Sequence, residues 1–403
     1  MRNICLFFSF LFLLTVKGEA QDFGPNTKVS LITIGAGKDL YSKFGHSALR
    51  LYDVDSGLDL AYNYGTFDFN TPNFYPKFVR GKLDYIISVD RYAPLMRYYR
   101  QTGRVTYEQQ LDLDSMQVQR IASFLKENLK PENVSYKYDF FYDNCATRLR
   151  DVLEYAFDGN LKYKEYENSD KVYRDLLIEK LDKSPLILLG INLILGPQTD
   201  RGIDVRGEMF LPEYLMDNME AFASTDNAEG SFVGEKQLIF PDRSELKSIG
   251  LLQQPAFYVF LLLVITFLIY RQNTMVGLNR GLDLFMMALV SLICLLFVFM
   301  WVGTDHGTTY ANWNLLWANP IAIYLFVSLL RKKELSKGLL KAYKALLLVA
   351  VTFLVLIPVV QELISRDILS FLQLPKHIPF QFFLLGLIAL LYVRILNMER
   401  QKS

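Results

Sequence analysis

The chain has 403 residues, and its 43 Lys and Arg against 42 Asp and Glu give a formal net charge of +1. This balance excludes nucleic acid as the main partner, because binding to the phosphate backbone needs an excess of positive charge. Hydrophobic residues make up 51% of the chain and charged residues 21%, which excludes a disordered or collagen-like protein. Three cysteines exclude a disulfide scaffold, and with three histidines we expect neither a metal nor a cofactor.

The N-terminus has the pattern of a cleaved secretory signal. Arg2 precedes an apolar run over 4–16, and Gly18 and Ala20 are small residues at the minus-three and minus-one positions. The apolar run is shorter than the roughly 20 residues that a membrane span needs, which favours cleavage over an uncleaved anchor. We therefore expect 1–20 to be a signal peptide.

Residues 21–250 have the mixed composition of a water-facing domain, and we expect them to form one exported domain. Alternating and β-branched segments predict strands, and Pro or Gly marks the ends of two helical segments. The expected strands lie at 28–34, 47–52, 60–64, 85–89 and 106–113, and the expected helices at 115–129 and 145–157. This order predicts an α+β domain whose sheet is assembled early in the chain.

Two motifs carry the only histidine and the only cysteine of this domain. His46 opens a strand within 44–50, and Cys145 opens a helix after Asn144, a good N-cap residue, within 138–151. A helix N-terminus lowers the pKa of a thiol, and a histidine within reach would complete a nucleophile–base pair. An unpaired cysteine is also often a buried small hydrophobe, so the residues alone leave both roles open.

The last part of the chain, 251–403, is dominated by apolar runs. They lie at 256–270, 281–302, 315–330, 342–360 and 378–396, and we expect five membrane-spanning helices there. The earlier apolar run 186–195 is too short to span. It is interpreted as a buried core segment or as a surface that dips into the outer leaflet.

Basic residues between the runs predict the orientation. The first connection carries Arg271 and Arg280, and six lysines and arginines lie within 331–344, whereas 303–314 has none. By the positive-inside rule the first and third connections and the C-terminal tail are cytoplasmic. Five spans after an exported domain end on that same side, so the number of spans and the charges agree.

At these motifs the chain resembles known proteins. Gly45-His46 followed later by Asn144-Cys145 resembles the circularly permuted NlpC-type papain-like fold, a group that includes lecithin retinol acyltransferase. Segments 45–51, 62–69 and 138–151 resemble the bacterial lipoprotein N-acyltransferase family Lnb, and 303–320 resembles its membrane part. The resemblance covers nearly the whole mature chain. It implies a multi-pass protein of the inner membrane, with an exported Cys/His domain joined to a five-helix membrane domain.

The resemblance also implies the reaction. A fatty acyl chain would move from a membrane glycerophospholipid, through a Cys145 thioester, to the amino group of a lipoprotein's N-terminal diacylglyceryl cysteine. His46 would accept the thiol proton, and backbone N–H groups near Asn144 would stabilise the oxyanion. We expect Asn63, on the next strand, rather than Tyr64 or Asp68, to orient His46.

Candidates for substrate contacts carry less evidence. Arg148 and Arg150 are suited to a lipid phosphate, although basic residues on a helix face are usually only solvated. Tyr64 is a further candidate near the pair. Asp305 and His306, in the second connection, are placed at the depth of lipid headgroups, where polarity alone also explains them.

Two other functions compete with this interpretation. A membrane-anchored cell-wall peptidase or amidase of the NlpC type would use the same Cys145 and His46, but it needs only one anchor. A protein that binds or transports lipids would not need the pair at all. The five apolar runs therefore favour acyl transfer over the peptidase, and the intact pair favours an enzyme over a lipid carrier.

Overall fold

The computed structural model describes residues 23–158, 161–163, 171–219, 222–224, 232–243, 250–271, 276–365 and 381–400. The expected signal peptide, 1–20, lies outside these residues. The chain divides into two compact units, each with its own core. Unit 1 comprises Met1–Lys171 and Gly202–Leu246, and unit 2 comprises Val172–Arg201 and Lys247–Ser403.

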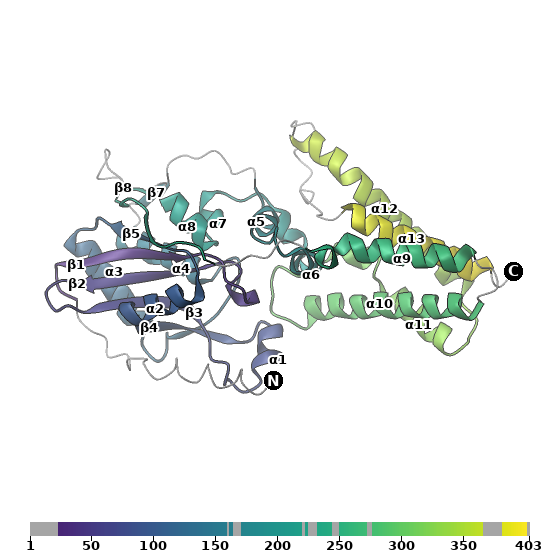
Figure 1. Ribbon diagram of the computed structural model, residues 1–403, viewed down its shortest axis with the longest axis horizontal. Coiled ribbons are helices and arrows are strands. Elements are labelled where there is room, and N and C mark those ends of the chain that lie inside the picture. Colours follow the sequence, from purple (N-terminus) through teal and green to yellow (C-terminus); the bar gives the residue numbers. More distant parts are fainter. Residues whose placement is uncertain are drawn as a thin grey trace. The chain divides into compact units, whose positions relative to one another are not determined.

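Unit 1 is built on a seven-stranded antiparallel sheet in the order β6-β4-β3-β2-β1-β5-β9 (Figure 1). Its strands are β1 (Thr27–Ile34), β2 (His46–Asp53), β3 (Asp59–Thr66), β4 (Asp84–Arg91), β5 (Thr106–Leu111), β6 (Ser135–Lys137) and β9 (Gln237–Phe240). The five strands expected from alternation are all present, because their inward-facing side chains form the core. A separate pair joins β7 (Leu161–Tyr163) to β8 (Phe222–Ser224).

Helices cover both faces of this sheet. The helices of unit 1 are α1 (Phe74–Val79), α2 (Tyr92–Thr102), α3 (Ser115–Asn128), α4 (Cys145–Ala156), α7 (Val205–Glu208) and α8 (Pro212–Asn218). Leu49 and Tyr62 belong to the apolar cluster that the sheet forms with α3 and α4. Ala48 instead packs with Met96 and Tyr99 of α2. Since side chains alternate along a strand, α2 lies on one face and α3 and α4 on the other.

The pairing of the central strands breaks down at one end. The register of β2 with β3 runs from Tyr52 and Asp59 only as far as Leu49 and Tyr62. On the other side of β3, the pairing with β4 shifts between Asn63 and Thr66. Gly65 lies inside this irregularity with a φ of +82°, a conformation that favours glycine. β-Bulges of this kind re-aim side chains next to functional sites.

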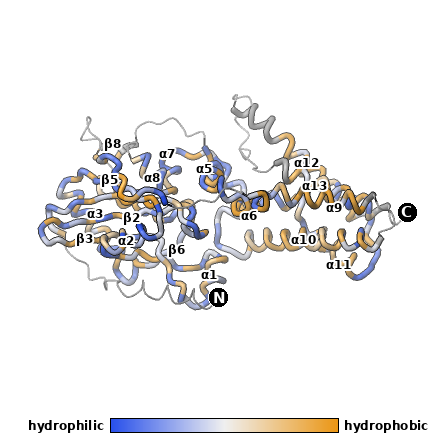
Figure 2. The backbone as a smooth tube through the Cα atoms, viewed as in Figure 1, coloured by the Kyte–Doolittle hydropathy of each residue, from blue (hydrophilic) through white to orange (hydrophobic). Residues whose placement is uncertain are grey.

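Unit 2 is helical. It contains α5 (Tyr173–Lys180), α6 (Pro185–Ile194), α9 (Pro255–Arg271), α10 (Val276–Val302), α11 (Pro320–Leu330), α12 (Lys337–Ser365) and α13 (Gln381–Arg400). Hydrophobic residues run along α9 and α10, whereas unit 1 is mixed (Figure 2). The short run that contains α6 belongs to this unit, and its Leu193 and Ile194 pack against the apolar cluster formed by the later helices.

Two of these helices are long and apolar enough to cross a membrane by length and composition. Within the described residues they contain the segments Gly277–Val302 and Lys337–Leu356. The expected span 315–330 is not one continuous helix, because a 3-10 helix at Trp313–Leu316 precedes α11, which starts at Pro320 behind its N-cap Asn319. At about 1.5 Å per residue, the 11 residues of α11 cover roughly half of the hydrocarbon core.

A buried ion pair ties two helices of unit 2 together. The Arg394 side chain of α13 is 0% exposed and donates to Asp283 of α10 at 2.6 Å. Its second nitrogen donates to the side chain of Asn279 at 3.1 Å. A charge in such surroundings is stable only when it is paired and hydrogen-bonded, so these contacts fix how α10 and α13 pack.

Candidate active site

Cys145 is the first residue of α4, and the cap before it fixes its position. The Asn144 side chain accepts hydrogen bonds from the N–H groups of Ala146, at 2.8 Å, and Thr147, at 3.0 Å. The Thr147 hydroxyl in turn accepts from the Asn144 N–H at 2.7 Å. The Asn144 amide also donates to the carbonyls of Phe140 and Phe210. Asn144 is thus fully engaged as a capping residue, which fixes the backbone on which the thiol stands.

The Cys145 thiol is buried and unpaired, at 8% exposure. Burial raises its pKa above the ordinary value, and hydrogen bonds from the backbone of Ser47, Ala146 and Cys145 itself act in the opposite direction. Ser47 directly follows His46, beyond the point where β2 and β3 stop pairing. Its N–H is therefore able to reach the sulfur. At neutral pH the resting group is the protonated thiol.

His46 is held by Asn63, whose Oδ1 lies 3.1 Å from the His46 Nε2. The Asn63 Nδ2 donates to Asp90 Oδ2 at 3.0 Å and to the Ala61 carbonyl at 3.3 Å. Because both of these partners accept, the amide oxygen must face the imidazole, and Nε2 must carry the hydrogen. This leaves Nδ1 as the unprotonated nitrogen that can accept a proton. The structure therefore places Asn63 where a residue that sets the tautomer would have to lie.

The electrostatic surroundings keep His46 neutral. Burial lowers its pKa to about 4, the hydrogen bond with Asn63 opposes this effect, and the charge of Arg104 reinforces it. The ring is nevertheless only half-buried. A neutral imidazole is able to accept a proton, as a general base must.

The strand opposite the thiol approaches it closely. A Cβ at Gly65 would lie 3.7 Å from the Cβ of Cys145 and 3.3 Å from the ring of Tyr138. Tyr138 is stacked on Tyr85, with ring centroids 4.4 Å apart, and has little room to move. A side chain at Gly65 would therefore strain the backbone and press on the start of α4.

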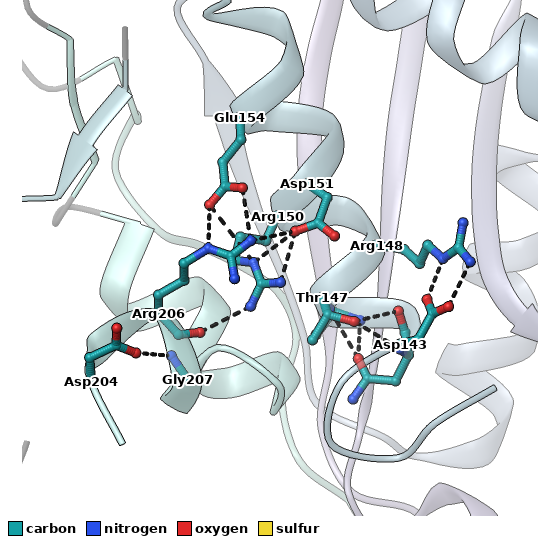
Figure 3. A network of polar contacts seen from close by, with 11 residues as sticks. Asp143, Thr147, Arg148, Arg150, Asp151, Glu154, Asp204, Arg206 and Gly207 are labelled. Carbon is teal, nitrogen blue, oxygen red and sulfur yellow. Dashed lines mark hydrogen bonds and ion pairs between the residues drawn. The ribbon is translucent and has the colours of Figure 1, made fainter. Parts of the chain in front are cut away.

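Of the residues expected to bind substrate, Arg148 is held by an acidic partner and Tyr64 is buried in the core. Arg148 forms an ion pair with Asp143, with a second contact at 2.7 Å, and its guanidinium lies 4.1 Å from the centre of the Tyr136 ring. Figure 3 shows Arg148 turned towards Asp143 and away from Arg150. Tyr64 is 1% exposed and belongs to the core beneath α4.

Arg150 belongs to a separate network at the same helix (Figure 3). It donates to Asp151 at 2.8 Å and to the Arg206 carbonyl at 3.0 Å. Arg206 pairs with Glu154 at 2.8 Å. These contacts fasten α7 to α4, so the Arg150 guanidinium is occupied in holding the scaffold.

Asp305 and His306 lie in unit 2, in the connection after α10. Asp305 is exposed and His306 is half-buried. The same connection packs against the end of α6, since the side chains of Asn312 and Asn314 both donate to the Leu193 carbonyl, at 2.6 Å and 3.1 Å. Among the residues that the structure describes, no group of three or more His, Cys, Asp or Glu side chains is placed to hold a metal ion.

Sequence reasoning missed three residues around the pair. Asp90 fixes the Asn63 amide, Ser47 offers its N–H to the sulfur, and the charge of Arg104 lowers the pKa values of both Cys145 and His46. Only Ser47 had a signal, its place beside the histidine. Asp90 and Arg104 lie in no motif. The pairing of β4 with β3 brings Asp90 to Asn63, and the turn after α2 brings Arg104 close to Gly35.

Asn63→Ala is expected to lower kcat by roughly 10- to 100-fold while the protein stays folded, because the imidazole loses the partner that sets its tautomer. Asn63→Gln, which keeps an amide, should retain more activity than Asn63→Ala. The measurement uses purified full-length variants and the acyl transfer that the family resemblance implies. Wild-type kcat in Asn63→Ala would contradict the role of the hydrogen bond.

Alkylation of Cys145 by iodoacetamide should be slow at pH 7 and should rise with pH to beyond 9. The reason is that burial raises the pKa of the thiol, so the thiolate fraction grows throughout this range. The rate at each pH can be followed by the mass of the Cys145 peptide. A plateau already reached near pH 6 would instead show a preformed thiolate–imidazolium pair.

Residues 20–179 match the family model of the Lnb N-terminal periplasmic domain. Residues 247–403 match that of the Lnb transmembrane domain. No curated protein and no solved structure matches the chain. The two matches follow each other in the same order as the polar and apolar parts of the sequence.

Proposed function

The chain belongs to the Lnb family, whose activity is lipoprotein N-acylation, and on this premise we propose that it transfers a fatty acyl chain from a membrane glycerophospholipid through a thioester on Cys145. The acceptor is the amino group of a lipoprotein's N-terminal diacylglyceryl cysteine. Two observations support this most: the thiol stands at a capped helix start, and Asn63 fixes the tautomer of His46.

In the first half-reaction His46 Nδ1 takes the proton of the Cys145 thiol as the sulfur attacks the ester carbonyl. The ester C–O bond breaks, and the imidazolium returns the proton to the departing glycerol oxygen, which leaves a lysophospholipid. The backbone N–H groups that act on the sulfur, those of Ser47, Ala146 and Cys145, are the candidate donors to the oxyanion.

In the second half-reaction the amine attacks the thioester carbonyl and the C–S bond breaks. His46 takes a proton from the attacking nitrogen and returns it to the sulfur, so the enzyme is regenerated. A thioester suits this step because it is reactive towards amines, provided that water is kept away. The burial of Cys145, at 8% exposure, supports that condition.

Confinement to a membrane supports acyl transfer over wall hydrolysis. Donor and acceptor are both lipids anchored in one leaflet, which raises their effective concentrations at a membrane-bound site. The Lnb transmembrane domain covers 247–403, far more chain than an anchor requires. Acyl transfer is therefore favoured over hydrolysis by an NlpC-type peptidase or amidase.

The test is mass spectrometry of lipoprotein N-termini from cells with and without the protein. Loss of the protein should leave lipoproteins with a free amino group, one acyl chain short. Complementation with wild type should restore the chain, and complementation with Cys145→Ala should not. Unchanged N-termini together with altered cell-wall fragments would favour the peptidase.

The proposed orientation puts unit 1 in the periplasm and the C-terminus in the cytoplasm, with α9–α13 crossing the inner membrane. Reporter fusions at Thr308 should report the periplasm, and fusions near Lys337 and after Arg400 should report the cytoplasm. Because α11 is short, the fusion near Lys337 tests whether α11 crosses the membrane. If α11 only enters and leaves the bilayer, the Lys337 fusion will report the same side as the Thr308 fusion.

A further inference from the structure

Unit 1 contains a cavity of about 330 Å³ with a strongly basic wall. Three arginines line it, Arg100 at the end of α2, Arg104 just after α2, and Arg243 after β9. The remaining wall is formed by Gly103 and by the apolar residues Ile239, Phe240 and Pro241. No carboxylate lines it, so the cavity suits an anion.

Arg104 is the buried member of this group, at 8% exposure. Its Nε donates to the Gly35 carbonyl at 2.8 Å, and its guanidinium lies 5.4 Å from the centre of the Tyr99 ring. One terminal nitrogen, NH2, is buried without a hydrogen-bond partner. A buried cationic donor left unsatisfied is costly, which suggests a ligand that supplies the missing acceptor.

The other two arginines of the cavity wall, Arg100 and Arg243, are exposed and can donate hydrogen bonds to a bound anion. Within the described residues, none of the three guanidinium groups forms an ion pair. This distinguishes them from Arg148 and Arg150, which are held by acidic partners. An arginine cluster without carboxylates provides planar donors for a tetrahedral oxyanion such as a phosphate.

Arg104 links the cavity wall to the end of the sheet that carries His46. Gly35, which anchors Arg104, directly follows Ile34, and Ile34 is the register partner of His46 in the sheet. The charge of Arg104 also acts on both His46 and Cys145. In a glycerophospholipid only the glycerol carbons separate the phosphate from the acyl esters. A phosphate bound at Arg104 would therefore hold an ester close to this end of the sheet.

We infer that the cavity formed by Arg100, Arg104 and Arg243 binds the phosphate of the donor phospholipid and presents the neighbouring ester to Cys145. This inference rests on the proposed acyl transfer. It assigns the cavity a role in selection, because the diacylglyceryl group of the acceptor has ester-linked chains but no phosphate. Arg104 would act as the buried contact, and the two exposed arginines would act at the rim.

The test measures binding rather than turnover, so that it remains valid if the reaction is different. Full-length Cys145→Ala protein in detergent is titrated by calorimetry with short-chain phosphatidylethanolamine and with a diacylglycerol of the same chains. We expect the phospholipid to bind more tightly. Adding Arg104→Gln should weaken phospholipid binding by about 10- to 100-fold and leave diacylglycerol binding unchanged.

Three further variants keep the test decisive. Arg104→Lys should retain part of the preference, and the rim variants Arg100→Gln and Arg243→Gln, which alter exposed side chains, should each weaken phospholipid binding even if Arg104→Gln folds poorly. Arg97→Gln is the matched control, since Arg97 is an exposed arginine of α2 that does not line the cavity. It should change nothing.

The results separate the possible failures. Equal binding of the two lipids, or rim variants that behave like Arg97→Gln, would overturn the inference. Inorganic phosphate that binds as tightly as the phospholipid would also overturn it and would indicate a site for free phosphate. Phospholipid selectivity without any acylation of wild-type Cys145 would support the phosphate site and contradict the proposed reaction instead.

Discussion

Replacing Cys145 by alanine is expected to abolish N-acylation while the protein still folds and inserts. The side chain removed is small and belongs to a cluster that α4 shares with the sheet, and the cap of Asn144 and Thr147 remains. Loss of an activated nucleophile typically lowers the rate by several orders of magnitude. The measurement is transfer of a labelled acyl chain to a synthetic diacylglyceryl-cysteine peptide by the purified full-length protein.

Cys294→Ala provides the matched control. Cys294 is also a buried free cysteine, but it lies in the core of unit 2, within α10. Its removal should leave transfer intact, whereas Cys145→Ala should abolish it. Substantial transfer by Cys145→Ala would contradict a covalent intermediate on this sulfur.

Replacing His46 by alanine is expected to lower kcat by roughly 100- to 10,000-fold, because general-base catalysis by a positioned imidazole contributes about that much. In the wild type the base should work down to low pH, since burial lowers the His46 pKa to about 4. Activity should therefore persist as pH falls from 7 to 5 and should be lost around 4. A loss of activity already near pH 6.5 would show that the His46 pKa is not lowered.

Stability gives a second measurement on the same residue. The folded protein resists protonating His46, whose pKa is lowered from 6.5 to about 4, while the unfolded chain does not. The free energy of unfolding should hence fall as pH drops from about 6.5 towards 4, and His46→Gln should reduce this dependence. The same pH dependence in wild type and His46→Gln would show that other groups cause it.

Much of unit 1 could be predicted from sequence, because a strand with one buried face alternates visibly. The segments around Leu31, Leu49 and Tyr62 do so, and their side chains form the core. α2 gave no such signal, since Tyr92–Thr102 is rich in arginine and tyrosine and carries Pro94 in its first turn. The position of α2 is fixed by the packing of Met96 and Tyr99 against Ala48 of the sheet, a tertiary contact that local sequence does not reveal.

In the candidate site, too, some residues have a local sequence signal and others are fixed only by tertiary contacts. Asn63 could be singled out because it lies on the strand next to that of His46, and the structure places the two in contact at 3.1 Å. The cap at Asn144 was visible as a residue preference. Arg104 was not visible, because its importance comes from burial and from a carbonyl 69 residues away in the sequence.

The helical part was predictable as apolar runs but not in its details. The helix α11 starts only at Pro320, behind its N-cap Asn319, so it is shorter than the apolar run 315–330. The segment Val172–Arg201 joins unit 2 rather than the unit in which it is embedded in sequence. A buried pair between Arg174 and Asp200, at 2.7 Å, ties the two ends of this segment to each other, and pairing between residues 26 positions apart has no local sequence signal.

The central claim is a thioester on Cys145, and the most direct measurement is the intact mass of the full-length protein after incubation with phospholipid and no acceptor. We predict a mass increase of one acyl chain that maps to the Cys145 peptide, is removed by neutral hydroxylamine, and is lost when the diacylglyceryl-cysteine peptide is added. Cys145→Ala should show no adduct. Acyl transfer that proceeds with Cys145 unmodified, or an adduct on another residue, would contradict the account.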